Sequence, residues 1–243
     1  MGKLCDEIEY RILGQEMQAV IVTLDPGEQV LAEAGSMLYM SEGIDMQASL
    51  DPAEGGGFFG GLFKGMGRMF TGESFFITTF TNRGDVRADV AFSAPYPGKI
   101  LPIDMEGIGG RLFCQKDAFL CAARGTEISV AFQKRIGSGF FGGEGFILQR
   151  LDGDGLCFVH AGGTVFEIEL TDKQPLRIDT GSLVAFQPSV DYDVEWVGGV
   201  KNALFGGEGF FFATLKGPGK VYLQTLPLSR LADRLASARR RLL

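Results

Sequence analysis

The stretch FGGEGFILQRLDGDGLCFVHAGG, residues 141–163, decides the fold class of this chain. Two apolar runs of strand length, at 145–151 and 156–161, flank the turn sequence DGDG at 152–155. Short apolar runs joined by an Asp-Gly turn predict a β-hairpin. A twelve-residue calcium loop would need an acidic last ligand, which this stretch lacks.

Further β-rich runs occur along the 243 residues, and turn sequences such as DPGE (25–28) and KGPGK (216–220) separate them. They lie at 19–24, 74–80, 182–187, 192–197, 209–215 and 220–226. The chain also contains 36 Gly and 21 Phe, which suit tight turns and a bulky core. Many short strands punctuated in this way predict an all-β sandwich or barrel.

The phrase FGGEGF recurs at 205–210, and a looser copy, TGESFF, lies at 71–76. Glu144 and Glu208 are 64 residues apart, and LCAARGT (120–126) and LVAFQPS (183–189) are 63 apart. In the first copy we align VLAEAGS (30–36) with these two. The spacing predicts three tandem β-units packed as one rigid body, because one such unit is too short to bury its apolar face alone. Their expected bounds are 8–101, with an insertion at 51–70, then 102–166 and 167–228.

Three glycine-preceded glutamates mark the repeated turn. They are Glu73, Glu144 and Glu208, preceded by Gly72, Gly143 and Gly207. A carboxylate can accept several backbone N–H groups that glycine turns expose, which gives a structural role. The alternative is a metal-dependent enzyme that uses these acids. We favour the structural role, because no second acid or histidine repeats with them.

Two segments are candidate contact elements. The insertion GGGFFGGLFKGMGRMF (55–70) places aromatic and basic residues on a glycine-rich loop, namely Phe58, Phe59, Phe63, Lys64 and Arg68. It could cover its own unit, bind a neighbouring subunit or touch lipid. Residues 229–243 predict an amphipathic helix with a leucine stripe and with Arg234, Arg239, Arg240 and Arg241 off that stripe. That helix either docks through its stripe or meets an anionic surface.

Composition limits the classes of function. The formal charge is −7, which disfavours nucleic-acid binding. The four cysteines form no CxxC pair, and His160 is the only histidine, so we expect free buried thiols, no zinc site and no cofactor. His160 lies inside an apolar strand, where a buried structural histidine is more common than a catalytic base. No signal-like or membrane-spanning apolar run occurs, so we expect a cytoplasmic protein, peripheral to a membrane at most.

Several longer phrases resemble the bacterial branch of the altered-inheritance-of-mitochondria family of unknown function. They include MQAVIVTLDPGEQVLAEAGSMLYM (17–40), APYPGKILPIDM (94–105) and FGGEGFFFATLKGPGKVYLQTLPLSRLA (205–232). The resemblance implies three TRAP-like units, each a short double-stranded β-helix, and a homotrimeric ring. It implies no catalytic residues. It does not imply the RNA or tryptophan binding of the protein for which that fold is named.

The sequence therefore favours a non-enzymatic oligomeric scaffold or membrane-associated organiser, with another protein or a membrane surface as its partner. The first alternative is a small-ligand-binding module with pockets between β-units. The second is the metal-dependent enzyme that uses the repeated glutamates.

Overall fold

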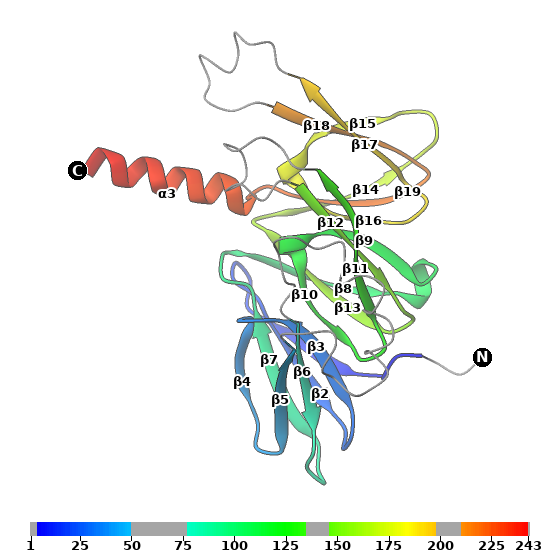
Figure 1. Ribbon diagram of the computed structural model, residues 1–243, viewed down its shortest axis with the longest axis vertical. Helices are drawn as coiled ribbons and strands as arrows, with labels where there is room; N and C mark the ends of the chain where they lie inside the picture. Colours follow the sequence, from blue (N-terminus) through cyan, green and yellow to red (C-terminus); the bar gives the residue numbers. More distant parts are fainter. Residues whose placement is uncertain (1–3, 50–76, 135–145, 198–209, 243) are drawn as a thin grey trace.

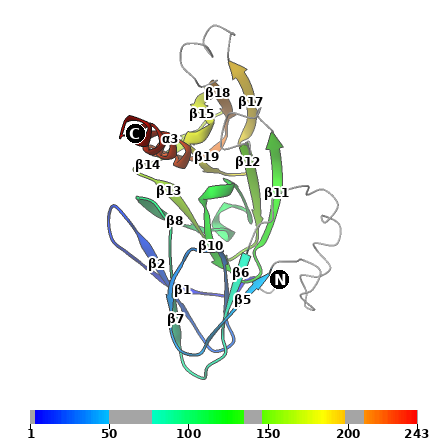
Figure 2. The same ribbon diagram turned by 60° about the vertical axis from the view of Figure 1, so that its left-hand side comes forward.

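The computed structural model describes residues 4–49, 77–134, 146–197 and 210–242. These residues form nineteen β-strands and one α-helix, α3 (Leu228–Leu242), which confirms the predicted all-β class with a C-terminal helix. The sheets are stacked along the long axis of the molecule, with the strands of the first third at one end and β15, β17 and β18 at the other (Figures 1 and 2).

The strands have the following bounds. They are β1 (Glu9–Leu13), β2 (Ala19–Leu24), β3 (Gln29–Glu33), β4 (Met37–Met40), β5 (Ile44–Ser49), β6 (Ile77–Asn82), β7 (Ala88–Ser93), β8 (Gly98–Asp104), β9 (Arg111–Gln115), β10 (Phe119–Ala123), β11 (Glu127–Lys134), β12 (Phe146–Asp152), β13 (Leu156–Gly162), β14 (Val165–Leu170), β15 (Leu176–Asp179), β16 (Leu183–Phe186), β17 (Asp191–Val197), β18 (Phe210–Lys216) and β19 (Gly219–Gln224). Short 3-10 turns, η2 (Glu106–Ile108), η3 (Lys116–Ala118) and η5 (Thr180–Ser182), lie between strands.

Four sheets organise these strands. Their strand orders are β1-β2-β7-β4, β5-β6-β3-β10-β13-β8, β11-β12-β9-β16-β19-β14 and β15-β18-β17. In each six-stranded sheet, three strands come from one stretch of chain and three from the next. The halves join through the antiparallel pairs β3–β10 and β9–β16. Backbone hydrogen bonds therefore run across both internal junctions, and the buried core is shared by consecutive thirds of the chain.

The strand registers show which positions correspond. β4, β10 and β16 pair with β7, β13 and β19, and each pairing contains a register shift, between 37 and 39, 119 and 121, and 183 and 185 respectively. A β-bulge at the same place in each pair makes Met37, Phe119 and Leu183 equivalent. The alignment of VLAEAGS with LCAARGT is therefore wrong, because the first four residues of VLAEAGS belong to β3, whereas β4 is the counterpart of β10. The spacing of the second and third copies is 64 residues at this strand as well, rather than 63.

The opening stretch forms two strands joined by a turn, but the predicted β-hairpin is wrong, because β12 and β13 lie in different sheets and pair with other strands. Residues 153–155 form the turn between β12 and β13, and all four cysteines are free and buried. The predicted unit boundaries at 101 and 166 fall inside β8 and β14. The turn also has a use that the sequence did not indicate. The Asp154 carboxylate accepts hydrogen bonds from the backbone N–H groups of Leu4 and Cys5 at 2.9 and 2.8 Å. These bonds hold residues near the N-terminus against the turn between β12 and β13.

Candidate functional site

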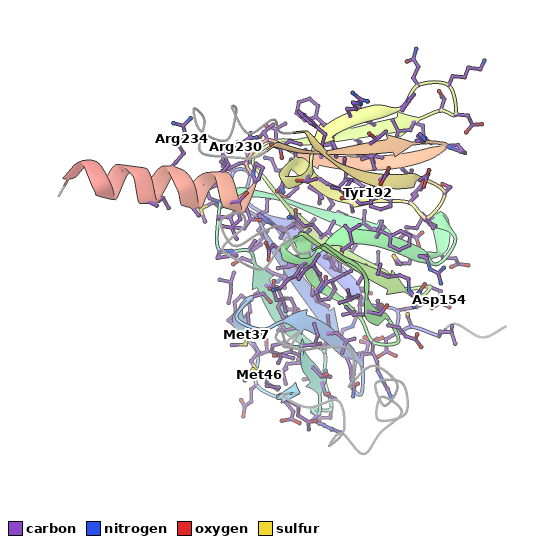
Figure 3. All side chains as sticks on the ribbon, turned by 45° about the horizontal axis from the view of Figure 1, so that its top comes forward. Met37, Met46, Asp154, Tyr192, Arg230 and Arg234 are labelled. Atoms are coloured by element: carbon purple, nitrogen blue, oxygen red, sulfur yellow. The ribbon has the colours of Figure 1, made fainter. Side chains whose placement is uncertain are left out.

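Strand β4 carries the most unusual surface of the described residues. Among the described strands it pairs only with β7, which places it at the edge of its sheet. All four of its side chains are exposed and large, from Met37 at 36% to Leu38 at 55%. Met46, on the next strand in the chain, is 46% exposed and lies at the same end of the molecule as Met37 (Figure 3). An apolar edge strand with free backbone groups is a surface for pairing with another chain.

The strands equivalent to β4 have the opposite environment. β10 and β16 are buried along their whole length in the hydrophobic cores, and β3 and β9 pair with their second edges. Tyr39 is 46% exposed, whereas its counterparts Cys121 and Ala185 are completely buried. The equivalent strand edge is thus paired at β10 and at β16, whereas no described strand pairs with it at β4.

Strand β15, at the far end of the molecule (Figure 1), is a second edge strand whose equivalents are internal. It pairs only with β18, whereas its equivalents β3 and β9 are internal strands. Ile178 of β15 is buried, and Arg177 and Asp179 on either side are exposed. Asp179 accepts a hydrogen bond from Arg230 of α3 at 2.8 Å, which ties the start of that helix to this edge.

A small polar pocket lies where α3 begins. Its lining residues are Tyr96, Gln115, Asp117, Ala118, His160, Gln224, Pro227, Leu228 and Ser229. The space measures about 30 Å³, which is room for about one or two water molecules. Sites for drug-sized ligands are about 300–1,000 Å³. This pocket is therefore too small for the ligand-binding alternative as it stands.

Burial perturbs His160 strongly in this pocket. Its side chain is 3% exposed, and its ring packs edge-on against Tyr96 with the centroids 4.6 Å apart. Burial lowers its pKa to about 4, although a hydrogen bond with the Tyr96 backbone acts in the opposite direction. Nδ1 has no hydrogen-bond partner among the described residues. At neutral pH the ring is uncharged, so it has no acidic proton ready for general-acid catalysis.

Gln224 of β19 occupies the position equivalent to His160 of β13, one repeat further along the chain. Its Oε1 accepts a hydrogen bond from Gly162 N–H at 2.8 Å, and its Nε2 donates to the Gly181 carbonyl at 3.0 Å. The two pairings His160↔Ile100 and Gln224↔Val165 make Pro97 the counterpart of Gly162. Gly162 donates its backbone N–H to Gln224, but proline has no N–H to donate. His160 therefore lacks the equivalent backbone hydrogen bond, and its Nδ1 has no partner among the described residues.

Most of the residues singled out in the sequence cannot be placed. The repeated glutamates and glycines, Glu73, Glu144, Glu208, Gly72, Gly143 and Gly207, lie outside the described residues, as do Phe58, Phe59, Phe63, Lys64 and Arg68. Arg234 is exposed on α3 (Figure 3). The side chains of Arg239, Arg240 and Arg241 are outside the described set. The described residues contain no cluster of three His, Cys, Asp or Glu side chains suited to a metal ion.

The fold defines a class: an all-β protein that continues its sheets from one third of the chain to the next and has edge strands at both ends. A family model described as mitochondrial biogenesis AIM24 matches residues 10–226, and the chain belongs to this family. The resemblance drawn from the sequence is thereby confirmed.

Two relatives from Streptococcus pyogenes resemble this chain. An uncharacterized protein of serotype M6 is 29% identical over 238 residues, which cover 96% of this chain and 92% of the relative. A crystal structure of an S. pyogenes protein from a structural genomics consortium has a TM-score of 0.74 and 24% identity, and it covers 98% of this chain and 100% of that one. The second likeness supports the fold alone. Within the described residues, no helix has the length and apolar character needed to cross a membrane.

Proposed function

We propose that this protein is a subunit of a homo-oligomeric scaffold, which acts by assembly and not by catalysis. The observation that carries the proposal is the exposed apolar edge of β4, in a fold whose two equivalent strands are fully buried. Natural proteins usually protect such an edge with charge, proline or a covering element. β4 has the sequence MLYM, with neither charge nor proline, so protection by another protein chain is the simplest explanation.

The C-terminal helix gives the scaffold a second contact element. α3 extends away from the sheets (Figure 1), and Leu235 at 63% exposure and Arg234 project from it. Its fifteen residues carry five arginines and one aspartate in a chain whose formal charge is −7. A basic amphipathic helix on an acidic protein suits an anionic lipid surface. Cyclic symmetry would give every copy of α3 the same orientation to the ring axis, so that several weak contacts act together.

Mass photometry at micromolar and lower concentrations tests the assembly. We expect an oligomer for the natural chain and dissociation for Leu38→Lys combined with Met40→Lys, because charge on a strand edge opposes pairing. Phe166→Lys is the matched control, since Phe166 is 53% exposed on another edge strand, β14. A natural chain that is monomeric at micromolar concentration would refute the scaffold.

Flotation with phosphatidylglycerol vesicles tests the membrane contact separately. We expect binding that weakens with salt and is lost on changing Arg234→Glu with Leu235→Ser, because both the charge and the apolar face contribute. Arg124→Glu removes an exposed arginine elsewhere and should leave flotation unchanged. If the helix variant floats as well as the natural chain, α3 is not the membrane contact.

A further inference from the structure

We infer that the free edge of β4 is covered by β15 of a second copy of this chain, in an antiparallel register that places Tyr39 opposite Ile178. The inference rests on the proposed assembly. It adds which two strands meet, which way the copies are arranged and which residues face each other.

β4 belongs to a set of three equivalent strands. β4, β10 and β16 pair with β7, β13 and β19 and carry their register shift at the same place. Tyr39 therefore corresponds to Cys121 and Ala185. At both internal junctions the outer edge of this strand pairs with the preceding third of the chain, through β3 or β9. Among the described strands, none pairs with this edge of β4.

β15 belongs to a second set of three equivalent strands. β3, β9 and β15 pair with β6, β12 and β18. Each of them ends four residues before the start of the next strand in the set above: Glu33 before Met37, Gln115 before Phe119, and Asp179 before Leu183. The penultimate residues Ala32, Cys114 and Ile178 are therefore equivalent. No strand within the described ranges pairs with the outer edge of β15.

The register then follows from the two junctions that exist. Cys121 lies opposite Ala32 and Ala185 lies opposite Cys114. Applied to the uncovered edges, the same rule places Tyr39 opposite Ile178 of the second copy. One residue further, Ala122 faces Leu31 and Phe186 faces Phe113, so Met40 would face Arg177. An aromatic side chain opposite a β-branched one is a favourable cross-strand pair.

The contact unites the incomplete sheets of the fold. The three-stranded sheet β17-β18-β15 has the strand composition of one half of a six-stranded sheet, and β4-β7-β2 has that of the other half. Joining them across two copies reproduces the internal arrangement, with β1 as an additional outer strand. The two surfaces are different, so the contact is head-to-tail, and repetition closes a ring or extends a filament.

Cysteine pairing tests the register. The double variant Tyr39→Cys, Ile178→Cys should form disulfides between chains on oxidation, seen as multimers on a non-reducing gel. The two positions lie at opposite ends of one chain, so they cannot bridge within it (Figure 1). The four natural cysteines are buried and should contribute little background. The control pair is Tyr39→Cys, Arg177→Cys, because a one-residue slip turns the second side chain to the other face.

Mixing the two single variants separates the arrangements of the copies. Head-to-tail pairing predicts a disulfide between a Tyr39→Cys chain and an Ile178→Cys chain, and little product from either variant alone. A homodimer of Tyr39→Cys alone would overturn the inference in favour of a symmetric β4–β4 contact. An intact oligomer without crosslinking of the double variant would also overturn it and leave the scaffold standing. A monomer by mass photometry would overturn both.

Discussion

Acidification from pH 6.5 to 4 should remove the stabilising contribution of the single histidine, His160. The folded chain holds His160 neutral, with a pKa of about 4, whereas an unfolded histidine has a pKa of about 6.5. Between these two values the unfolded state binds a proton that the folded state does not. The free energy of unfolding therefore falls as the pH falls from 6.5 to 4 and is unaffected by this group above that window.

The size of the effect follows from the separation of the two pKa values. They differ by about 2.5 units, and each unit is about 1.4 kcal/mol, so the full loss is about 3 kcal/mol. At pH 5 the expected loss is about 2 kcal/mol. Little discounting for solvent is needed, because the side chain is 3% exposed. A loss of this size is a considerable share of the stability of a typical domain.

Urea unfolding at one protein concentration, at pH 7, 6, 5 and 4.5, measures the loss. His160→Gln is the reference, since Gln224 shows that glutamine is accepted at the equivalent position and glutamine does not titrate. The difference between the two proteins should widen by about 1.4 kcal/mol per pH unit below 6.5, while the contributions of carboxylates cancel. A difference that stays constant from pH 7 to 4.5, or an NMR titration of the single imidazole near pH 6.5, would refute the reasoning.

Three further predictions concern contacts that hold the sheets together. Asp154→Asn should weaken the hold on the N-terminal residues, so that a thiol reagent modifies Cys5 faster than in the natural chain. Gly98→Ala should lower the free energy of unfolding by about 1–3 kcal/mol, because its Cβ would lie within 2.5 Å of an imidazole nitrogen and still closer to a backbone carbonyl. Gly107→Ala, whose nearest neighbour is a carboxylate oxygen at 3.4 Å, is its control. Gln224→Leu should cost about 1–3 kcal/mol for each of the two buried backbone groups that it leaves without a partner, measured by urea unfolding.

Some strands were predicted closely from the sequence, and others were missed. β2, β12, β13, β18 and β19 match predicted runs closely, because each crosses a sheet interior and its apolar residues reflect burial. β4 and β15 were not predicted. They have four residues each, which is too short for a clear alternation, and their role depends on neighbours distant in the sequence. The candidate site was thus missed, although MLYM is a visible apolar run once its exposure is known.

The sequence by itself determined the class of fold, the C-terminal helix, the free buried cysteines and the membership of a family. These follow from local patterns of apolar residues, turns and long shared phrases. The tertiary structure decided which strands correspond, because the shared β-bulge and the pairing across sheets are visible only when strands meet. It also decided that the edges of β4 and β15 remain uncovered. An uncovered edge is a property of the whole sheet, since it depends on where pairing stops.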